Sequence, residues 1–279
     1  MEANVKRRVK SFVTSVLVRL GLYQRIKQSI IYDLYWSIAD RKLLIERSAE
    51  VDFYRQILKG LKGGDIIFDI GANRGHKTDI FLRLGATVIA VDPDRVNQEI
   101  LNQRFLNLRM LRRPVTVVPK AAGASVRPEV MWIDEPGSAK NTLSPKWVDT
   151  LRANDSRFGR KLDFSVQKVV EMTTLDMLIE EFGIPFFIKI DVEGYEALVL
   201  AGLHRSVPFL SFEVNLPEFL SEGIKCVDAL SRLSKGGTFN YVSSCSLKLL
   251  SEHWFGSDEC VAVLKSCRES SIEVLWRSG

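Results

Sequence analysis

Three carboxylates in this sequence follow short apolar runs, and residues of this type at the ends of strands can do chemistry. Asp69 stands in FDIGANRG at 68–75, Asp92 stands in VDPD, and Asp191 stands in IKIDVEG. A carboxylate can accept hydrogen bonds from the hydroxyl or ammonium groups of a ligand, and it can act as a general base. Ligands of open parallel sheets bind outside the carboxyl ends of the strands. The sequence therefore predicts a binding and catalytic site at that edge.

The loop that contains Asp69 selects among nucleotide-like ligands. Its glycines, Gly71 and Gly75, are separated by three residues, and Asn73 stands where a dinucleotide-binding loop has its middle glycine. His76 occupies the place of the third glycine, so a pyrophosphate lacks close backbone approach. No Gly-Lys-Ser/Thr follows, which excludes a phosphate-binding P-loop. S-adenosylmethionine has no phosphate; Asp69 can help to hold its amino group, and the glycines allow close approach.

Asp92 is expected to hold the ribose hydroxyls of such a ligand. It follows Gly71 by 21 residues and ends the second strand. Proteins that bind NAD place an acid at about the same distance, so Asp92 alone does not discriminate between the two ligands. A purely structural alternative also stays open, in which the glycines only permit tight packing of a strand against a helix.

The elements that must position these residues alternate between strand and helix. Strands are expected at 65–70, 87–92, 115–122, 185–191 and 208–215, and helices at 77–85, 97–108, 173–183, 193–203 and 217–234. This alternation predicts an α/β fold with a doubly wound parallel sheet. The runs 239–244 and 260–266 are expected to close the sheet as an antiparallel pair.

Two segments lie outside this rhythm. Residues 1–58 are expected to form a basic, helical N-terminal extension, in which 5–20 has apolar residues at three- and four-residue spacing. That face could pack on the main domain, on a second subunit or on an anionic membrane. The main domain is expected over 59–279. It contains an insertion of hairpins and loops at 124–168, a candidate acceptor-binding element.

The motifs resemble those of the FkbM-type methyltransferases, a branch of the class I enzymes that use S-adenosylmethionine. The resemblance rests on FDIGANRG, VDPD, TLD, FIKIDVEGYEALVLAGL and FEVN, which lie between residues 65 and 215. The long motif is the most specific of them. The resemblance implies a Rossmann-like, mostly parallel seven-stranded sheet with helices on both faces and an antiparallel closing strand. It also implies methyl transfer, typically to a hydroxyl of a sugar, a glycan or a natural product.

The resemblance carries over roles to single positions. The positions implied around the methionine end of the cofactor belong to the glycine loop: Asp69, Gly71, Asn73 and Gly75. Asp92 would hold the ribose. Lys120 and Ala121, which follow the third strand, would lie near the adenine.

The acceptor side of the site is expected around Asp191, at the end of the fourth strand, where the transferable methyl group should point. Methylation of a hydroxyl needs in-line placement of the acceptor oxygen and a base for its proton. Asp191 or Glu193 could be that base, and His76, at the start of the first helix, is a competitor. Glu213 lies near the end of the fifth strand, so three acids are expected to converge.

Other roles of these acids stay open. Asp191 and Glu213 could hold a divalent cation that lowers the pKa of the acceptor, although we predict catalysis without a metal. Glu193 could cap the helix that follows it. Lys189 and Glu213, on adjacent predicted strands, could form a buried ion pair with no chemical role.

The amino-acid composition indicates where in the cell the protein is expected. The net charge of +5 and the pI near 9.0 suit an acidic partner or surface without identifying one. The four cysteines have no metal-binding spacing and favour a reducing, cytoplasmic location. No apolar run reaches about 18 residues, so a membrane span is not predicted. Peripheral contact with the inner membrane surface, or with another subunit, through 5–20 stays open.

Three other functions fit the residues in part. The missing middle glycine disfavours an oxidoreductase that uses a nicotinamide cofactor. A nucleic-acid methyltransferase typically has Asn/Asp-Pro-Pro-aromatic after the fourth strand, where this sequence has Asp-Val-Glu-Gly, so we expect no nucleic-acid partner. A non-catalytic binding module on the same fold is the main alternative. The presence of both Asp92 and Asp191 favours an enzyme that acts on a small-molecule or glycan hydroxyl.

Overall fold

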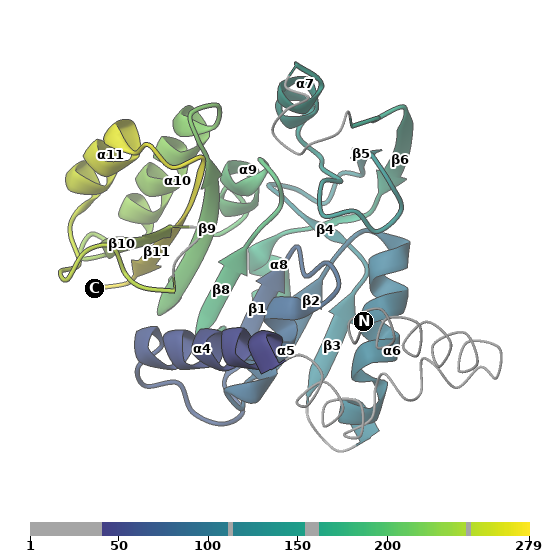
Figure 1. Cartoon of the computed structure of the whole chain (residues 1–279), viewed down its shortest axis with the longest axis horizontal. Coiled ribbons are helices and arrows are strands. Elements are labelled where there is room, and N and C mark those ends of the chain that lie inside the picture. The colour runs from purple at the N-terminus through teal and green to yellow at the C-terminus, as the bar shows by residue number, and fades with distance from the viewer. Residues whose placement is uncertain (1–40, 111–113, 154–161, 244–246) are drawn as a thin grey trace, which may run out of the picture.

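A seven-stranded sheet forms the centre of the protein. The computed structural model describes residues 41–110, 114–153, 162–243 and 247–279 (Figure 1). The strands of the sheet, in spatial order, are β10 (Thr238–Ser243), β11 (Ser271–Arg277), β9 (Phe209–Asn215), β8 (Phe187–Ile190), β1 (Ile66–Ile70), β2 (Thr87–Val91) and β3 (Val115–Val118). β9, β8, β1, β2 and β3 run parallel, and β11 is antiparallel to both of its neighbours. This architecture confirms the predicted doubly wound sheet with an antiparallel closing strand.

Helices cover both faces of the sheet because its strands are apolar on both sides. The helices whose buried residues pack with Ile67 of β1 are α4 (Arg41–Ile57), α5 (His76–Arg83) and α6 (Arg95–Met110). Those that pack with Phe68, which points to the opposite face, are α8 (Leu175–Phe182), α9 (Glu196–Leu200), α10 (Leu220–Leu233) and α11 (Ser257–Ser266). Successive side chains of a strand alternate between faces, so one apolar run supplies both cores.

Local signals explain where several of these elements begin. The Thr174 side chain accepts a hydrogen bond from the backbone N–H of Met177 at 3.1 Å, so Thr174 caps α8. α5 begins after Gly75, whose φ of 76° lies in the left-handed region. Glycine reaches that region without strain, which allows the sharp turn from β1 into the helix.

The predicted strand at 260–266 is wrong, because this segment lies in α11. Cys260 and Leu264 are four residues apart and both are buried on one face, and Asp258 and Glu259 lie in the first turn of the helix. The closing strand is β11 instead. Short apolar runs do not distinguish a strand from one buried helix face, and here packing against α10 decides.

The insertion contains α7 (Pro145–Ala153) and most of a ribbon made of β5 (Glu129–Ile133) and β6 (Val166–Val170). A second small sheet, of β4 (Ala121–Ala122) and β7 (Met172–Thr173), flanks its two ends. β5 pairs with β6 as an antiparallel ribbon, and β4 pairs with β7 in parallel. Figure 1 shows α7, β5 and β6 together at one end of the molecule. Trp147 of α7 is fully buried against Phe219, so the insertion has a small core of its own.

The second half of α4 belongs to the main core, since Val51, Tyr54 and Ile57 are buried with residues of β1. The predicted apolar stripe at 5–20 and most of the N-terminal extension lie outside the described residues. Over the residues that the structure describes, every helix is too short or too polar to span a membrane.

Candidate active site

A cavity lies at the carboxyl ends of β1, β2 and β8, which is where the strand order predicts a ligand site. The sequence-predicted residues that line it are Gly71, Asn73, Asp92, Lys120, Ala121, Asp191 and Glu193. The insertion supplies the opposite wall with residues such as Met131, Asn141 and Leu143. The cavity therefore joins the predicted cofactor positions to the predicted acceptor side.

Asp69 and Gly75 do not line this cavity. Asp69 is 2% exposed and accepts a hydrogen bond from the hydroxyl of Thr78 at 2.5 Å. Burial raises the pKa of Asp69 to about 6. A Cβ at Gly75 would lie 2.7 Å from side-chain atoms of Leu101 and Phe105, so this glycine permits close packing of α5 on α6. The structural alternative for the glycines therefore holds at Gly75.

Gly71 lies where the backbones of two strands come closest. Its φ is 82°, and a Cβ placed there would stand 1.9 Å from the carbonyl oxygen of Asp191. The Gly71 N–H donates to the carbonyl of Val91 at 2.9 Å. This one glycine therefore brings together the ends of β1, β2 and β8, which carry the loop, Asp92 and Asp191.

Asp92 organises the glycine loop. Its carboxylate accepts hydrogen bonds from the backbone N–H groups of Asn73 at 2.7 Å and Asp94 at 2.9 Å, and from the side chain of Asn97 at 3.3 Å. Burial raises the pKa of Asp92 to about 6, although these hydrogen bonds oppose the shift. Asn73 has a φ of 48°, and the bond to Asp92 fixes this uncommon conformation.

The charges on the cavity wall fit S-adenosylmethionine better than a dinucleotide. The acidic and basic residues that line the cavity are Asp92, Asp94, Lys120, Asp191 and Glu193. This predominantly acidic wall suits a sulfonium and an ammonium group, and it would repel a pyrophosphate. A carboxylate also offers about four acceptor positions, so Asp92 can bind loop N–H groups and a ribose hydroxyl together.

The turn after β8 is shaped by Glu196. Its carboxylate accepts hydrogen bonds from the N–H groups of Val192 at 3.1 Å and Gly194 at 3.3 Å. Glu193 and Gly194 both have positive φ, 53° and 88°. Burial raises the pKa of Glu196 to about 7. The last glutamate of the Lys-Ile-Asp-Val-Glu-Gly-x-Glu motif therefore holds the strained turn that presents Asp191.

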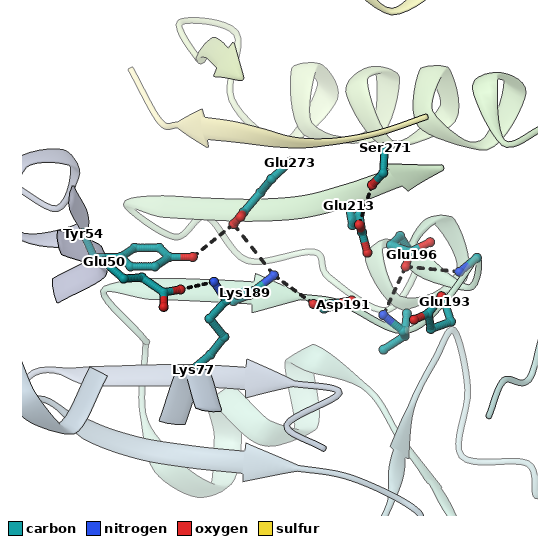
Figure 2. A network of polar contacts seen from close by, with 12 residues as sticks. Glu50, Tyr54, Lys77, Lys189, Asp191, Glu193, Glu196, Glu213, Ser271 and Glu273 are labelled. Carbon is teal, nitrogen blue, oxygen red and sulfur yellow. Dashed lines mark hydrogen bonds and ion pairs between the residues drawn. The ribbon is translucent and has the colours of Figure 1, made fainter. Parts of the chain in front are cut away.

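A buried charge network reaches Asp191 from the sheet. Figure 2 shows Lys189 between two acids: its ammonium lies 3.2 Å from Asp191 Oδ2 and 3.8 Å from Glu273 Oε1. The Tyr54 hydroxyl donates to Glu273 at 3.4 Å. Sequence reasoning missed Glu273 and Tyr54. No local pattern marks these two residues, because Glu273 contacts Lys189 and Tyr54 from a strand far away in the sequence.

Asp191 and Glu213 are neighbouring carboxyl groups, and each shifts the pKa of the other. Two carboxyls this close disfavour a state in which both are ionised. Burial, together with the charges of Asp191 and Glu193, raises the pKa of Glu213 to about 8, and Ser271 hydrogen-bonds to Glu213. Burial also acts to raise the pKa of Asp191, but Lys189 and the bond from Glu213 hold it below its usual value. Glu213 is therefore the protonated partner at neutral pH.

Glu193 does not cap α9. Its carboxylate pairs with the Lys140 ammonium at 3.1 Å, and its backbone carbonyl accepts from the Thr142 hydroxyl at 2.8 Å. Burial raises the pKa of Glu193, while Lys140 opposes this shift. The Lys189 ammonium forms its ion pairs with Asp191 and Glu273. This wider network replaces the Lys189–Glu213 ion pair that the sequence left open.

His76 lies apart from these acids. It is exposed at the start of α5, and the cavity wall does not include it. Partial burial, with Arg104 and Arg47 nearby, lowers its pKa. We therefore do not retain His76 as the base. Within the described ranges, no group of three or more His, Cys, Asp or Glu side chains is arranged to hold a metal ion.

Replacing Glu213 with glutamine should change how stability depends on pH. Folded protein keeps the Glu213 proton up to about pH 8, whereas an unfolded chain releases it near 4.5. Between these values the folded state binds more protons, so rising pH lowers the free energy of unfolding by up to about 1.4 kcal/mol per unit. Glutamine cannot titrate, yet it can still donate to Asp191. Urea unfolding should show Glu213→Gln gaining stability over wild type from about pH 5 to about pH 8.

Glu99→Gln is the matched control, because Glu99 is an exposed residue of α6. Its curve of unfolding free energy against pH should run parallel to that of wild type over the same range. Parallel curves for Glu213→Gln would contradict a protonated Glu213 at neutral pH.

Comparison with known sequences gives one family match. A sequence model of the methyltransferase FkbM domain matches residues 69–227, which is more than half of the chain. The match contains the glycine loop, Asp92, Asp191 and Glu213. A search of curated proteins finds no match.

Solved structures of methyltransferases show a distant overall likeness. A TehB-like S-adenosylmethionine-dependent methyltransferase from Corynebacterium glutamicum has 12% identity and a TM-score of 0.40, over 87% of this chain and 97% of its own. Precorrin-6y C5,15-methyltransferase from Geobacter metallireducens has 11% identity and a TM-score of 0.39, over 84% and 88%. An O-methyltransferase from Bacillus cereus has 12% identity and a TM-score of 0.37, over 83% and 80%. Scores this low do not bear on the substrate.

Proposed function

This chain belongs to the FkbM family of methyltransferases, and we propose that it transfers a methyl group from S-adenosylmethionine to a hydroxyl oxygen of a sugar, a glycan or a natural product. The observation that carries the proposal is the position of Asp191. It stands on the wall of one cavity with Asp92 and Gly71 on one side and the insertion on the other. Methylation of a hydroxyl requires a base between the methyl donor and the acceptor, and this position of Asp191 would meet that requirement.

Different residues of the cavity would bind the cofactor and accept the proton. S-adenosylmethionine supplies an electrophilic methyl group on a positively charged sulfur. Asp92 binds the ribose hydroxyls, and the acidic wall favours the positive charge. Asp191 accepts the proton of the acceptor hydroxyl as the oxygen–methyl bond forms. The electron pair of the broken carbon–sulfur bond stays on sulfur, and the proton later leaves Asp191 for solvent.

The groups behind Asp191 keep it ionised and oriented. Lys189 and the protonated Glu213 contact the carboxylate, so Asp191 is held in its charged form at neutral pH. A base of low pKa is sufficient here because the methyl donor is a strong electrophile, and the proton needs removal only as the new bond forms. Glu193, with Lys140 beside it, is the second candidate base.

The remaining assignments are part of the same proposal. Residues 124–168 would bind the acceptor, and 1–58 would form an N-terminal extension to the methyltransferase domain at 59–279. The acceptor would be a small molecule or a glycan and not a nucleic acid. The protein would act in the cytoplasm, where contact with the inner membrane surface through 5–20 would bring it near membrane-linked glycans.

Replacing Asp191 with asparagine tests the chemical role. Transfer of a radioactive methyl group from S-adenosylmethionine would be followed in a panel of neutral sugars, glycans and polyhydroxylated natural products. We expect Asp191→Asn to lower the transfer rate by about 100-fold or more, because a positioned base contributes this much. Affinity for S-adenosylmethionine, measured by calorimetry, should change by less than about threefold.

Asp258→Asn, an exposed substitution in the first turn of α11 and outside the insertion, is the control and should transfer at the wild-type rate. Cofactor binding by wild type without transfer to any acceptor would favour the non-catalytic binding module. Equal rates in wild type and Asp191→Asn would rule out Asp191 as the base.

A further inference from the structure

A short segment of the insertion crosses the mouth of the cavity. We call residues 137–143 the strap. Ser138, Ala139, Asn141 and Leu143 of the strap line the cavity, opposite Gly71 and Asp92. These positions lie within the insertion, and the cofactor motifs include none of them. The strap therefore forms a wall of the cofactor site that comes from outside the family's glycine and acid motifs.

Asp94 holds the strap at Gly137 and again at Asn141. Asp94 Oδ2 accepts hydrogen bonds from the Gly137 N–H at 2.9 Å and from the Asn141 side-chain amide at 2.8 Å. Asp94 is only 6% exposed, and its own N–H donates to Asp92. The residue expected to hold the ribose and the residue that holds the strap therefore belong to one turn after β2.

The turn after β8 holds the strap at the two residues on either side of Asn141. Lys140 Nζ pairs with Glu193 Oε1 at 3.1 Å, and the Thr142 hydroxyl donates to the Glu193 carbonyl at 2.8 Å. The strap therefore spans the cavity from the cofactor side at Asp94 to the acceptor side at Glu193.

With the strap in this position the cavity is too small for the cofactor. Its volume is about 60 Å³. Sites for drug-sized ligands have volumes of about 300 Å³ or more, and one water takes about 30 Å³ of liquid. S-adenosylmethionine, with an adenine, a ribose and an amino acid, belongs to the larger class. The walls have suitable chemistry, so the strap must move before the ligand can enter.

The two fastenings differ in strength. The Lys140–Glu193 pair is partly exposed, with side-chain exposures of 27% and 12%, and solvent weakens ion pairs of this kind. The hydrogen bonds to the buried carboxylate of Asp94 are stronger, because their acceptor is charged and shielded from water. Gly137, with a φ of 72°, is held by Asp94 and can serve as the hinge. The Lys140–Glu193 contact should therefore open before the contacts with Asp94.

We propose that the strap is a gate for the cofactor site, with Asp94 as its anchor and the Lys140–Glu193 ion pair as its latch. Opening of the latch admits S-adenosylmethionine, and closure returns the strap over the bound ligand. This inference rests on the proposed use of that cofactor. Lys140 and Asp94 are positioning residues in this scheme, since they act through the strap.

Stopped-flow binding of S-adenosylmethionine to the full chain tests the gate, with tryptophan fluorescence as the signal. A gate predicts that the observed rate reaches a plateau as ligand concentration rises, because opening becomes limiting. Lys140→Met keeps the apolar stem and removes the charge. Its plateau should be up to about fivefold higher, which is the factor equivalent to 1 kcal/mol.

Lys146→Met is the matched control. Lys146 lies on α7 of the same insertion, and its ammonium pairs with the Glu222 carboxylate at 2.8 Å. This pair lies away from the cavity wall. Its plateau should equal that of wild type. A rate that rises linearly with ligand in the wild type would overturn the gate. Equal plateaus for Lys140→Met and Lys146→Met would also overturn it.

Hydrogen exchange on the free protein gives a second readout that needs no ligand. Lys140→Met should speed amide exchange within 137–143, whereas Lys146→Met should leave it unchanged. Unchanged exchange in Lys140→Met would overturn the latch. Folded wild type that does not bind S-adenosylmethionine would sink the proposed function, and exchange would still decide whether the Lys140–Glu193 pair holds the strap.

Discussion

Replacing Asp92 with alanine is expected to reduce the affinity for S-adenosylmethionine by at least about 100-fold, the largest binding effect that we predict. Hydrogen bonds to a charged group contribute about 1.5–3 kcal/mol each, and the ribose offers two hydroxyls. The variant also loses the acceptor for the Asn73 and Asp94 N–H groups, which are held at 2.7 and 2.9 Å. Both effects weaken binding, because the loop loses its shape together with its ligand contact.

Calorimetric titration of wild type and variant with S-adenosylmethionine measures this effect, and NAD serves as the negative ligand. Asp92→Asn should also bind poorly, since its amide would face the N–H donors of the loop. Glu99→Ala, on the exposed side of α6, should bind as wild type does. Wild-type affinity in a folded Asp92→Ala protein would remove Asp92 from the cofactor site.

Replacing Gly71 with alanine is expected to have the largest effect on stability. Its Cβ would stand 1.9 Å from the Asp191 carbonyl oxygen, a backbone atom that moves only if β8 moves. The positive φ adds a further cost of about 1 kcal/mol. We expect the free energy of unfolding to fall by about 3 kcal/mol or more, together with loss of cofactor binding, because the ends of β1 and β8 must separate.

Two other glycines separate the causes of this loss. Gly64 has a φ of 93° with open space around it, so Gly64→Ala measures the conformational cost alone. Gly63 also has open space and no positive φ, so Gly63→Ala should be nearly neutral. In urea unfolding, Gly71→Ala should lose far more free energy of unfolding than Gly64→Ala. Equal losses at Gly71 and Gly64 would show that contact with Asp191 does not matter.

The buried network around Lys189 costs free energy of folding, and its position beside Asp191 indicates why it is present. Burying charged groups is unfavourable even when they are paired, and apolar residues of similar size often stabilise a protein better. Here Lys189 lies between Asp191 on the cavity wall and Glu273 on β11. We infer that the network is kept for the ionisation and orientation of Asp191. Stability alone does not account for it.

The sequence by itself determined the elements and the cofactor side of the site. The alternation of apolar runs and amphipathic segments predicts the parallel sheet, since strand and helix periods are local properties. The glycine loop and Asp92 were readable because their spacing along the chain sets their geometry after β1 and β2. Gly71, Asn73 and Asp92 all line the cavity as a result.

Only the tertiary structure decided the rest, because the deciding contacts join residues far apart in the sequence. The register of β8, β9 and β11 places Lys189 beside Glu273, and no local pattern encodes that register. Packing on α10 turned the apolar run at 260–266 into a helix. The strap meets Asp94 and Glu193 only after the insertion folds back over the sheet. Local spacing therefore revealed the ligand class, whereas long-range packing set the protonation of the acids and the closure of the cavity.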